Sequence, residues 1–291
     1  MSEALHSSRR LGVVGAGVMG IGVAESCARA GHTVALYEVS EERRAEARAA
    51  LRRTSLVDRL RKNDPDDWLA RIEVLDDDTQ LLGSELILEN VTEDPDTKTA
   101  VHRRVGELCP DVPVVVNTSV IPITWLAERA GSPERFVGVH FMNPVPAKPL
   151  VEVIRGQLTS DVSFEAVLAF LRSIGKDWVL VADSPGFVSN AIFMTVINSA
   201  AELVETGVVD VEGVDRVFRE CFGHPMGPLE SADLIGVDTV VRSLHMLQRF
   251  VDVERYEPSQ GLVRLMDAGS VGRRVGHGFY QYARGRAGVT T

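Results

Sequence analysis

The chain has 291 residues, of which 45% are hydrophobic and 25% are charged, a composition that excludes a mainly disordered protein. This length predicts about two domains. The net charge of −10 excludes a basic, nucleic-acid-binding surface that covers the whole molecule.

The first part of the chain alternates short apolar runs with helical patterns. Apolar runs that predict strands cover residues 11–14, 33–37, 71–75, 86–89, 114–116 and 136–139. Helical patterns lie between them at residues 18–30, 41–62, 96–109 and 123–130, and Asp64-Pro65-Asp66 ends the second of these. The alternation predicts βαβ units and a mostly parallel sheet, which residues 151–154 and 178–181 extend.

The pattern changes after Asp183. Helical patterns cover residues 188–206, 211–222, 238–251 and 261–268, with no strand signal between them. The turn residues Ser184-Pro185-Gly186 come directly before this change. We therefore expect an α/β domain at residues 1–184 and an all-α domain at residues 185–291.

A glycine-rich segment, Gly15-Ala16-Gly17-Val18-Met19-Gly20, joins the first predicted strand to the first predicted helix. In this context a GxGxxG motif indicates a dinucleotide-binding site. Gly15 permits the tight turn, Gly17 lets a pyrophosphate approach the backbone, and Gly20 lets the helix pack close to the strand. The start of the helix, with Val18 and Met19, then offers N–H groups and a positive dipole to the phosphates.

Glu38 ends the second predicted strand, 23 residues after Gly15. An acidic residue near this place binds ribose hydroxyls in dinucleotide-binding domains. Because its carboxylate would repel a 2′-phosphate, NAD is favoured over NADP as the cofactor. Arg43 and Arg44 lie nearby and could accept a 2′-phosphate, so NADP stays open as the alternative.

Further short motifs follow in the rest of the chain, at residues 87–93 (ILENVTE), 117–119 (NTS), 140–144 (HFMNP), 151–154 (VEVI), 185–190 (PGFVSN), 224–229 (HPMGPL) and 278–280 (GFY). In this order, and with the glycine-rich segment, they resemble the 3-hydroxyacyl-CoA dehydrogenase family over residues 11–282. The resemblance implies a Rossmann-type dinucleotide-binding domain, followed by an all-α C-terminal domain that dimerises. It therefore implies a homodimer.

The resemblance also implies a catalytic set of Ser119, His140, Glu152 and Asn190. Oxidation of a β-hydroxyl removes a proton from oxygen, and histidine as a residue type suits a base for that proton, which is the role implied for His140. Glu152 could bind the other ring nitrogen and stabilise the imidazolium. Ser119 and Asn190 could hydrogen-bond the substrate oxygen and orient it towards the nicotinamide. The resemblance places three more residues at the cofactor: Glu93, Lys98 and Asn117.

Each catalytic assignment has a structural alternative. His140 could be a hydrogen-bonded core histidine, Ser119 could satisfy backbone groups at a strand end, and Asn190 could cap a helix. An unpartnered carboxylate at Glu152, in an apolar strand, would be costly, which favours a partner for it. We prefer the catalytic assignments because they agree with the motifs.

The sequence departs from the family's pattern near Ser119 and after the second strand. Val120 and Pro122 replace polar positions, which indicates an altered acyl pocket, and the helical arm after the second strand is shorter than usual. Similar dehydrogenases act on glyceryl groups bound to acyl carrier protein in polyketide extender-unit pathways. That substrate is therefore the alternative to an acyl-CoA.

The helical arm is rich in basic residues. Residues 41–63 hold eight basic and four acidic side chains, a net charge of +4 within a chain of net charge −10. Such a run is commonly a solvated helix face. It could also bind an anionic carrier, either the phosphates of CoA or an acidic acyl carrier protein. We assign four of its residues to this carrier site: Arg48, Arg52, Arg53 and Arg59.

The three cysteines, Cys27, Cys109 and Cys221, are too few and too scattered for a disulfide framework or a CxxC metal site, so we expect no metal. No apolar run approaches the roughly 18 residues that a membrane helix needs. The polar residues 1–10 do not resemble a signal peptide. We therefore expect a cytoplasmic protein that contacts neither membrane nor nucleic acid.

Three functions are compatible with these features. The first is the NAD-dependent oxidation of the β-hydroxyl of a 3-hydroxyacyl thioester, with His140 and Glu152 as the general base. The second is a dehydrogenase of a free hydroxy acid, for which the basic arm would be an ordinary solvated face. The third is an NAD-binding protein without activity, and the retained polar site argues against it.

Overall fold

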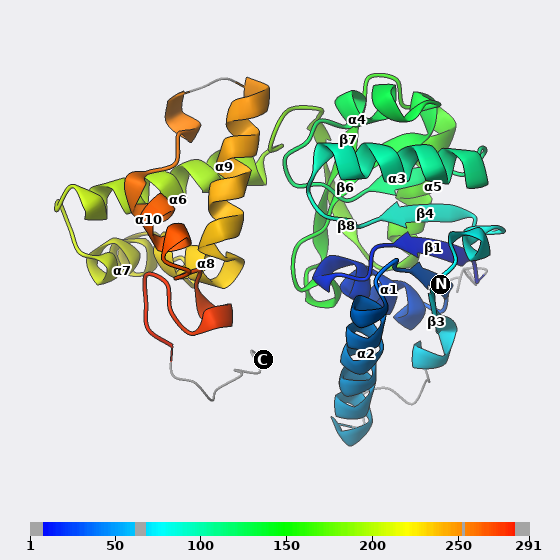
Figure 1. The fold of residues 1–291 in the computed structure, drawn as a ribbon, viewed down its shortest axis with the longest axis horizontal. Helices are drawn as coiled ribbons and strands as arrows, with labels where there is room; N and C mark the ends of the chain where they lie inside the picture. Colours follow the sequence, from blue (N-terminus) through cyan, green and yellow to red (C-terminus); the bar gives the residue numbers. More distant parts are fainter. Residues whose placement is uncertain (1–7, 62–67, 252–253, 283–291) are drawn as a thin grey trace, which may run out of the picture. The chain divides into compact units, whose positions relative to one another are not determined.

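The computed structural model describes residues 8–61, 68–251 and 254–282. The Asp64-Pro65-Asp66 segment, which was expected to end a helix, lies outside the described residues. The chain divides into two compact units, Met1–Ser184 and Pro185–Thr291, and each is described by itself (Figure 1). Among the described helices, none is both long enough and apolar enough to cross a membrane.

The first unit is built on an eight-stranded sheet of order β3-β2-β1-β4-β5-β6-β7-β8 (Figure 1). Its strands are β1 (Arg10–Val14), β2 (Thr33–Tyr37), β3 (Ile72–Leu75), β4 (Leu86–Glu89), β5 (Val114–Val116), β6 (Phe136–His140), β7 (Leu150–Arg155) and β8 (Asp177–Ala182). All neighbouring strands pair in parallel except β6 and β7, which are antiparallel. The predicted α/β class with a mostly parallel sheet is confirmed.

The central strands are buried along their whole length. Every residue of β4, β5 and β6 is buried, which explains why the sequence of these strands is apolar apart from Gly138 and the last residues of β4 and β6, Glu89 and His140. Leu11, Val13, Leu36, Val115 and Val137 belong to one hydrophobic core. The hydrophobic effect therefore stabilises the sheet, and the polar residues at the strand ends can form a site.

Helices connect the strands of the first unit. They are α1 (Val18–Arg29), α2 (Glu41–Arg61), α3 (Pro95–Leu108), α4 (Ile123–Ala130) and α5 (Asp161–Ser173), with short 3₁₀ turns at Trp68–Arg71, Asp78–Leu81, Pro133–Arg135 and Val145–Ala147. The start of α3 shows why a helix begins there. The carboxylate of Asp94 accepts the N–H of Thr97 at 2.8 Å, and Pro95 occupies the first helical position.

The long helix α2 is fastened to α1 by a charged contact. The carboxylate of Asp58, on α2, accepts hydrogen bonds from the guanidinium of Arg29, on α1, and from the indole N–H of Trp68. The guanidinium of Arg29 also lies over the ring of Trp68, 4.6 Å from its centre. These contacts fix the direction in which α2 leaves the sheet.

The second unit is helical, as predicted. Its helices are α6 (Ser189–Glu205), α7 (Val211–Phe222), α8 (Pro228–Ile235), α9 (Val237–Val251) and α10 (Gln260–Asp267), with 3₁₀ turns at Glu254–Tyr256 and Arg273–Val275. The buried carboxylate of Asp233 accepts the N–H groups of Phe279 and Tyr280 and the hydroxyl of Tyr282. The aromatic residues near position 280 therefore tie the end of the described chain to α8.

Candidate active site

The glycine-rich segment forms a tight turn between β1 and α1. Gly15 has a φ of +95°, a backbone conformation that residues other than glycine rarely adopt. A Cβ atom at Gly20 would lie 1.8 Å from the carbonyl oxygen of Gly15, whereas a Cβ atom at Gly17 would meet nothing within 4 Å. No side chain caps the start of α1, and Val18 is exposed there, while Met19 packs against the core. The uncapped turn with open space above Gly17 therefore fits a pyrophosphate.

Glu38 lies against this turn at the end of β2. Its side chain is buried, and its two carboxylate oxygens accept the N–H groups of Ala16 and Ser40, both at 3.0 Å. The guanidinium of Arg44 is occupied by the backbone, because it donates to the carbonyl oxygens of Glu38 and Val39 at 2.8 Å. An acid held here, beside an engaged arginine, fits the ribose of NAD better than the 2′-phosphate of NADP.

A cavity of ≈ 500 Å³ lies between the glycine-rich turn and α2. Its lining residues are Ala16, Gly17, Val18, Ile21, Arg43, Glu46, Ala49, Ala50 and Arg53. The α2 members recur every three or four residues and so share one face of the helix. Two cations, Arg43 and Arg53, therefore border the same space as the glycine-rich turn.

The structure separates the four arginines that were assigned to a carrier site. Arg53 lines the cavity, but Arg48 donates to the carbonyl oxygen of Val74 at 2.9 Å and so is tied to β3. Arg52 is exposed and is not among the lining residues, and the side chain of Arg59 lies outside the described residues. Arg43, which was not in that assignment, shares the cavity with Arg53.

His140 and Glu152 form a hydrogen-bonded pair at the end of β6. They are directly opposite each other in the antiparallel pairing of β6 with β7. The Nδ1 atom of His140 lies 2.8 Å from the Oε2 atom of Glu152, and each side chain is 11% exposed. A carboxylate at Nδ1 holds the tautomer in which Nδ1 carries the proton, so that Nε2 is the atom able to accept another.

Glu93 holds the turn that carries Ser119. Its Oε1 atom accepts hydrogen bonds from the hydroxyl of Thr118 at 2.6 Å, from the N–H of Ser119 at 2.8 Å and from the N–H of Val120 at 3.0 Å. The hydroxyl of Ser119 donates to the same atom at 3.2 Å. One carboxylate oxygen thus fixes both the backbone and the side chain of this turn.

Lys98 and Asn117 lie behind the Ser119 turn. Lys98 was expected beside the cofactor, but its side chain is fully buried, and its Nζ atom donates to Glu89 and to the carbonyl oxygen of Asn117, both at 2.9 Å. Its Nζ atom also lies 3.6 Å from Glu93. The amide of Asn117 donates to the side chain of Asn90 at 2.8 Å. Lys98 therefore acts on the site indirectly, through its contact with Glu93.

Glu89 and His102 complete this cluster, and the sequence analysis gave them no role. Both side chains are fully buried, and Glu89 Oε2 lies 2.9 Å from His102 Nε2. A usable signal was present, because Lys98 and His102 are four residues apart on one helix and Glu89 ends an apolar strand.

The charges of Glu89, Lys98 and Glu93 stabilise one another. Burial acts to raise the pKa of Glu89, but the charge of Lys98 and the hydrogen bond from His102 outweigh it and hold that pKa below its ordinary value. Burial acts to lower the pKa of Lys98, and Glu89 and Glu93 outweigh it and raise that pKa. The carboxylate and the ammonium therefore both stay charged.

Asn190 belongs to the second unit. It lies in the first turn of α6, where its N–H donates to the carbonyl oxygen of Gly186 at 3.1 Å, and Val188 occupies the N-cap position. The first unit by itself contains both the Ser119 turn, held by Glu93, and the pair of His140 and Glu152.

Among the described residues, no group of three or more His, Cys, Asp or Glu side chains is arranged to hold a metal ion.

Two family models match nearly the whole chain. The model for "3-hydroxyacyl-CoA dehydrogenase, NAD binding domain" matches residues 10–184, and the model for "3-hydroxyacyl-CoA dehydrogenase, C-terminal domain" matches residues 186–282. The 3-hydroxybutyryl-CoA dehydrogenase of Bradyrhizobium diazoefficiens is 38% identical over 97% of this chain and 98% of its own length. The probable 3-hydroxybutyryl-CoA dehydrogenase of Deinococcus radiodurans is 36% identical over 94% of this chain and 100% of its own length.

A solved structure has the same fold. The crystal structure of M. tuberculosis FadB2 is similar with a TM-score of 0.90 and 34% sequence identity, over 95% of this chain and 99% of that chain. The similarity therefore extends over both units rather than over the dinucleotide-binding part alone.

Substitution of Gly17 or Gly20 should weaken NAD binding, but only the substitution of Gly20 should also lower stability. Gly20→Ala forces a backbone displacement, so we expect a loss of roughly 1–3 kcal/mol in the free energy of unfolding, together with weaker binding of NAD. Gly17→Ala places a methyl group in open space, so we expect an unchanged Tm and a Kd for NAD raised about tenfold. Thermal unfolding and NAD titration measure both. Wild-type NAD affinity in Gly17→Ala would contradict the placement of the pyrophosphate.

Proposed function

The chain belongs to the 3-hydroxyacyl-CoA dehydrogenase family, and from this premise we propose that it oxidises the β-hydroxyl of a 3-hydroxyacyl-CoA with NAD. The observation that carries the proposal is the 2.8 Å contact between His140 and Glu152. The names of the relatives favour a short acyl chain of the 3-hydroxybutyryl kind. The three cysteines, which form no disulfide, favour a reducing compartment such as the cytoplasm.

Some residues of the first unit bind the cofactor and the substrate, and others transfer the proton. The glycine-rich turn would hold the pyrophosphate of NAD, and Glu38 would bind a ribose. Bound NAD would supply the acceptor for the hydride that leaves the β-carbon. His140 accepts the hydroxyl proton at Nε2, and Glu152 stabilises the imidazolium that forms. The hydroxyl of Ser119, held by Glu93, orients the substrate oxygen.

Substitution of the histidine or of its carboxylate tests the proposed base. His140→Gln removes the base, so we expect kcat for 3-hydroxybutyryl-CoA to fall by roughly 10²–10⁴-fold. Glu152→Gln replaces the acceptor at Nδ1 by a group that can donate, so we expect a loss of the same order. The Kd for NAD should stay at the wild-type value in both variants. Substantial turnover by His140→Gln would contradict the proposal.

We further propose that the carrier of the acyl group is CoA and that its phosphates contact Arg43 and Arg53. These two cations border the α2 side of the ≈ 500 Å³ cavity, whose other side is the glycine-rich turn that we assign to NAD. The space on the α2 side suits part of a small nucleotide-bearing molecule rather than a folded protein. The relatives described above are named for CoA substrates. Acyl carrier protein remains the alternative occupant, and the same arginines would then contact its acidic surface.

Neutralising the arginines distinguishes these carriers. In the double variant Arg43→Gln/Arg53→Gln, we expect KM for 3-hydroxybutyryl-CoA to rise about tenfold with little change in kcat, because a phosphate contact is lost. An N-acetylcysteamine thioester, which carries no phosphate, should keep its wild-type KM.

Arg52→Gln is the matched control, because Arg52 lies on the same helix and does not line the cavity. A larger kcat/KM for a carrier-protein thioester than for the CoA thioester would contradict the choice of CoA. A rise in the KM for NAD alone would assign the cavity to the dinucleotide instead.

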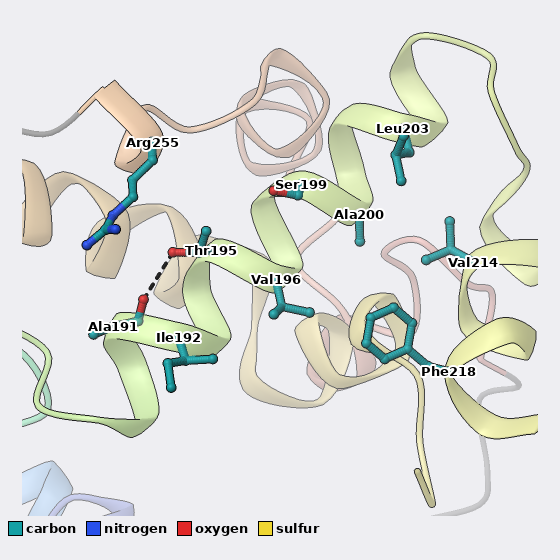
Figure 2. Close-up of a pocket in the computed structure, with 10 residues that line it drawn as sticks. All are labelled: Ala191, Ile192, Thr195, Val196, Ser199, Ala200, Leu203, Val214, Phe218 and Arg255. Atoms are coloured by element: carbon teal, nitrogen blue, oxygen red, sulfur yellow. Dashed lines mark hydrogen bonds between the residues drawn. The ribbon is translucent and has the colours of Figure 1, made fainter. Parts of the chain in front are cut away.

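We also propose that the protein is a homodimer that associates through α6 and α7. An apolar groove of ≈ 450 Å³ runs along these helices. Figure 2 shows the side chains of Val196, Leu203, Val214 and Phe218 converging on it. Leu203 is 44% exposed, and nearby Phe222 on α7 is 65% exposed. Apolar surface of this extent marks an interface, and a second copy supplies the same apolar helices in return.

A charge placed in the groove tests this interface. Leu203→Glu would bury a carboxylate in an apolar contact, so we expect it to convert a dimer into a monomer, as measured by sedimentation velocity. Val162→Glu is the control, because Val162 is exposed on α5 of the first unit. A monomeric wild-type protein at micromolar concentration would contradict the proposal.

A further inference from the structure

A closed polar cluster lies behind the Ser119 turn, at the junction of β4, β5 and α3. The side chains of Glu89, Lys98 and His102 are all fully buried. Glu89 Oε1 accepts the N–H of Val91 at 2.7 Å and the ammonium of Lys98 at 2.9 Å. Glu89 Oε2 accepts the same ammonium at 3.1 Å and lies 2.9 Å from His102 Nε2. Both oxygens of this carboxylate are thus fully engaged.

The cluster is connected to the Ser119 turn through Lys98. The ammonium of Lys98 donates to the carbonyl oxygen of Asn117, two residues before Ser119, and attracts the carboxylate of Glu93 from 3.6 Å. Glu93 in turn accepts the N–H and the hydroxyl of Ser119. A displacement of Lys98 would therefore move both the backbone that leads into the turn and the carboxylate that holds it.

His102 contributes a hydrogen bond to this cluster rather than a second positive charge. Its Nδ1 atom is buried and has no hydrogen-bond partner among the described residues. A proton on that atom would be left without an acceptor, which is more costly than an unused lone pair. The ring is therefore in the tautomer whose Nε2–H donates to Glu89. This hydrogen bond completes the set that the Glu89 carboxylate accepts, and it prevents rotation of that carboxylate away from Lys98.

We propose that His102 is a positioning residue for the oxidation reaction. It fixes Glu89, which fixes Lys98, and Lys98 holds the Glu93 carboxylate and the Ser119 turn in the geometry that orients the substrate oxygen. The inference rests on the proposed function, because it assigns the cluster to the same reaction. A purely structural role would instead affect the stability of the fold and leave turnover unchanged.

Two substitutions of similar size separate these roles. His102→Phe keeps a ring next to Phe136, whose own ring lies 5.0 Å away, but it cannot donate to Glu89. His102→Gln keeps an N–H donor at about the position of Nε2. We expect kcat for 3-hydroxybutyryl-CoA to fall about tenfold in His102→Phe and to stay within about threefold of wild type in His102→Gln, with unchanged Kd for NAD in both.

Hydrogen exchange provides a readout that does not depend on turnover. The amides of Ser119 and Val120 both donate to Glu93. Their exchange should accelerate about tenfold in His102→Phe and remain at the wild-type rate in His102→Gln. Val105→Ala is the control for a loss of stability, because it removes buried volume from α3 outside the cluster. It should lower Tm without changing kcat or the exchange of these two amides.

The proposal is overturned if His102→Phe keeps wild-type kcat and wild-type amide exchange. It is also overturned if His102→Gln loses as much activity as His102→Phe, because the bond to Glu89 would then not be the cause. A wild-type protein without turnover on any 3-hydroxyacyl-CoA would instead refute the proposed function. The exchange rates of Ser119 and Val120 would still decide whether His102 positions the turn.

Discussion

The antiparallel pairing of β7 with β6 is the constraint on which the candidate site depends. It places Glu152 directly opposite His140, the last residue of β6. Opposite residues in such a pair present their side chains on the same face of the sheet at close range. The resulting contact of 2.8 Å fixes the imidazole ring, and both side chains are buried enough to hold their geometry without much competition from water.

The parallel part of the sheet brings the other groups to the same edge. The strands β1, β4, β5 and β6 run in one direction, so their carboxyl ends carry the glycine-rich turn, Glu89, the Ser119 turn and His140 respectively. Open α/β sheets bind ligands at this edge. The polar groups there are buried by the fold, so each needs a partner, and the bonds of Lys98 and Glu93 meet that need.

The sequence predicted the features that depend on local pattern. Apolar runs predicted the strands, and the glycine spacing predicted the turn at residues 15–20. In that turn the structure leaves no room for a side chain at Gly15 or Gly20. Contacts between distant segments were less predictable. The burial of Lys98 requires knowledge of how α3 docks on the sheet, and the bond of Arg48 to Val74 requires the packing of α2 beside β3. A count of charges along α2 could not separate these roles.

The central claim is that Glu152 holds His140 as a base whose Nε2 atom is ready to accept a proton. The most direct test is NMR of the ring nitrogens of His140 in the resting enzyme near neutral pH. The account predicts that the proton of the neutral form of the ring is on Nδ1, and that this tautomer is lost in Glu152→Gln. A ring that carries its proton on Nε2 in the wild-type enzyme would contradict the account.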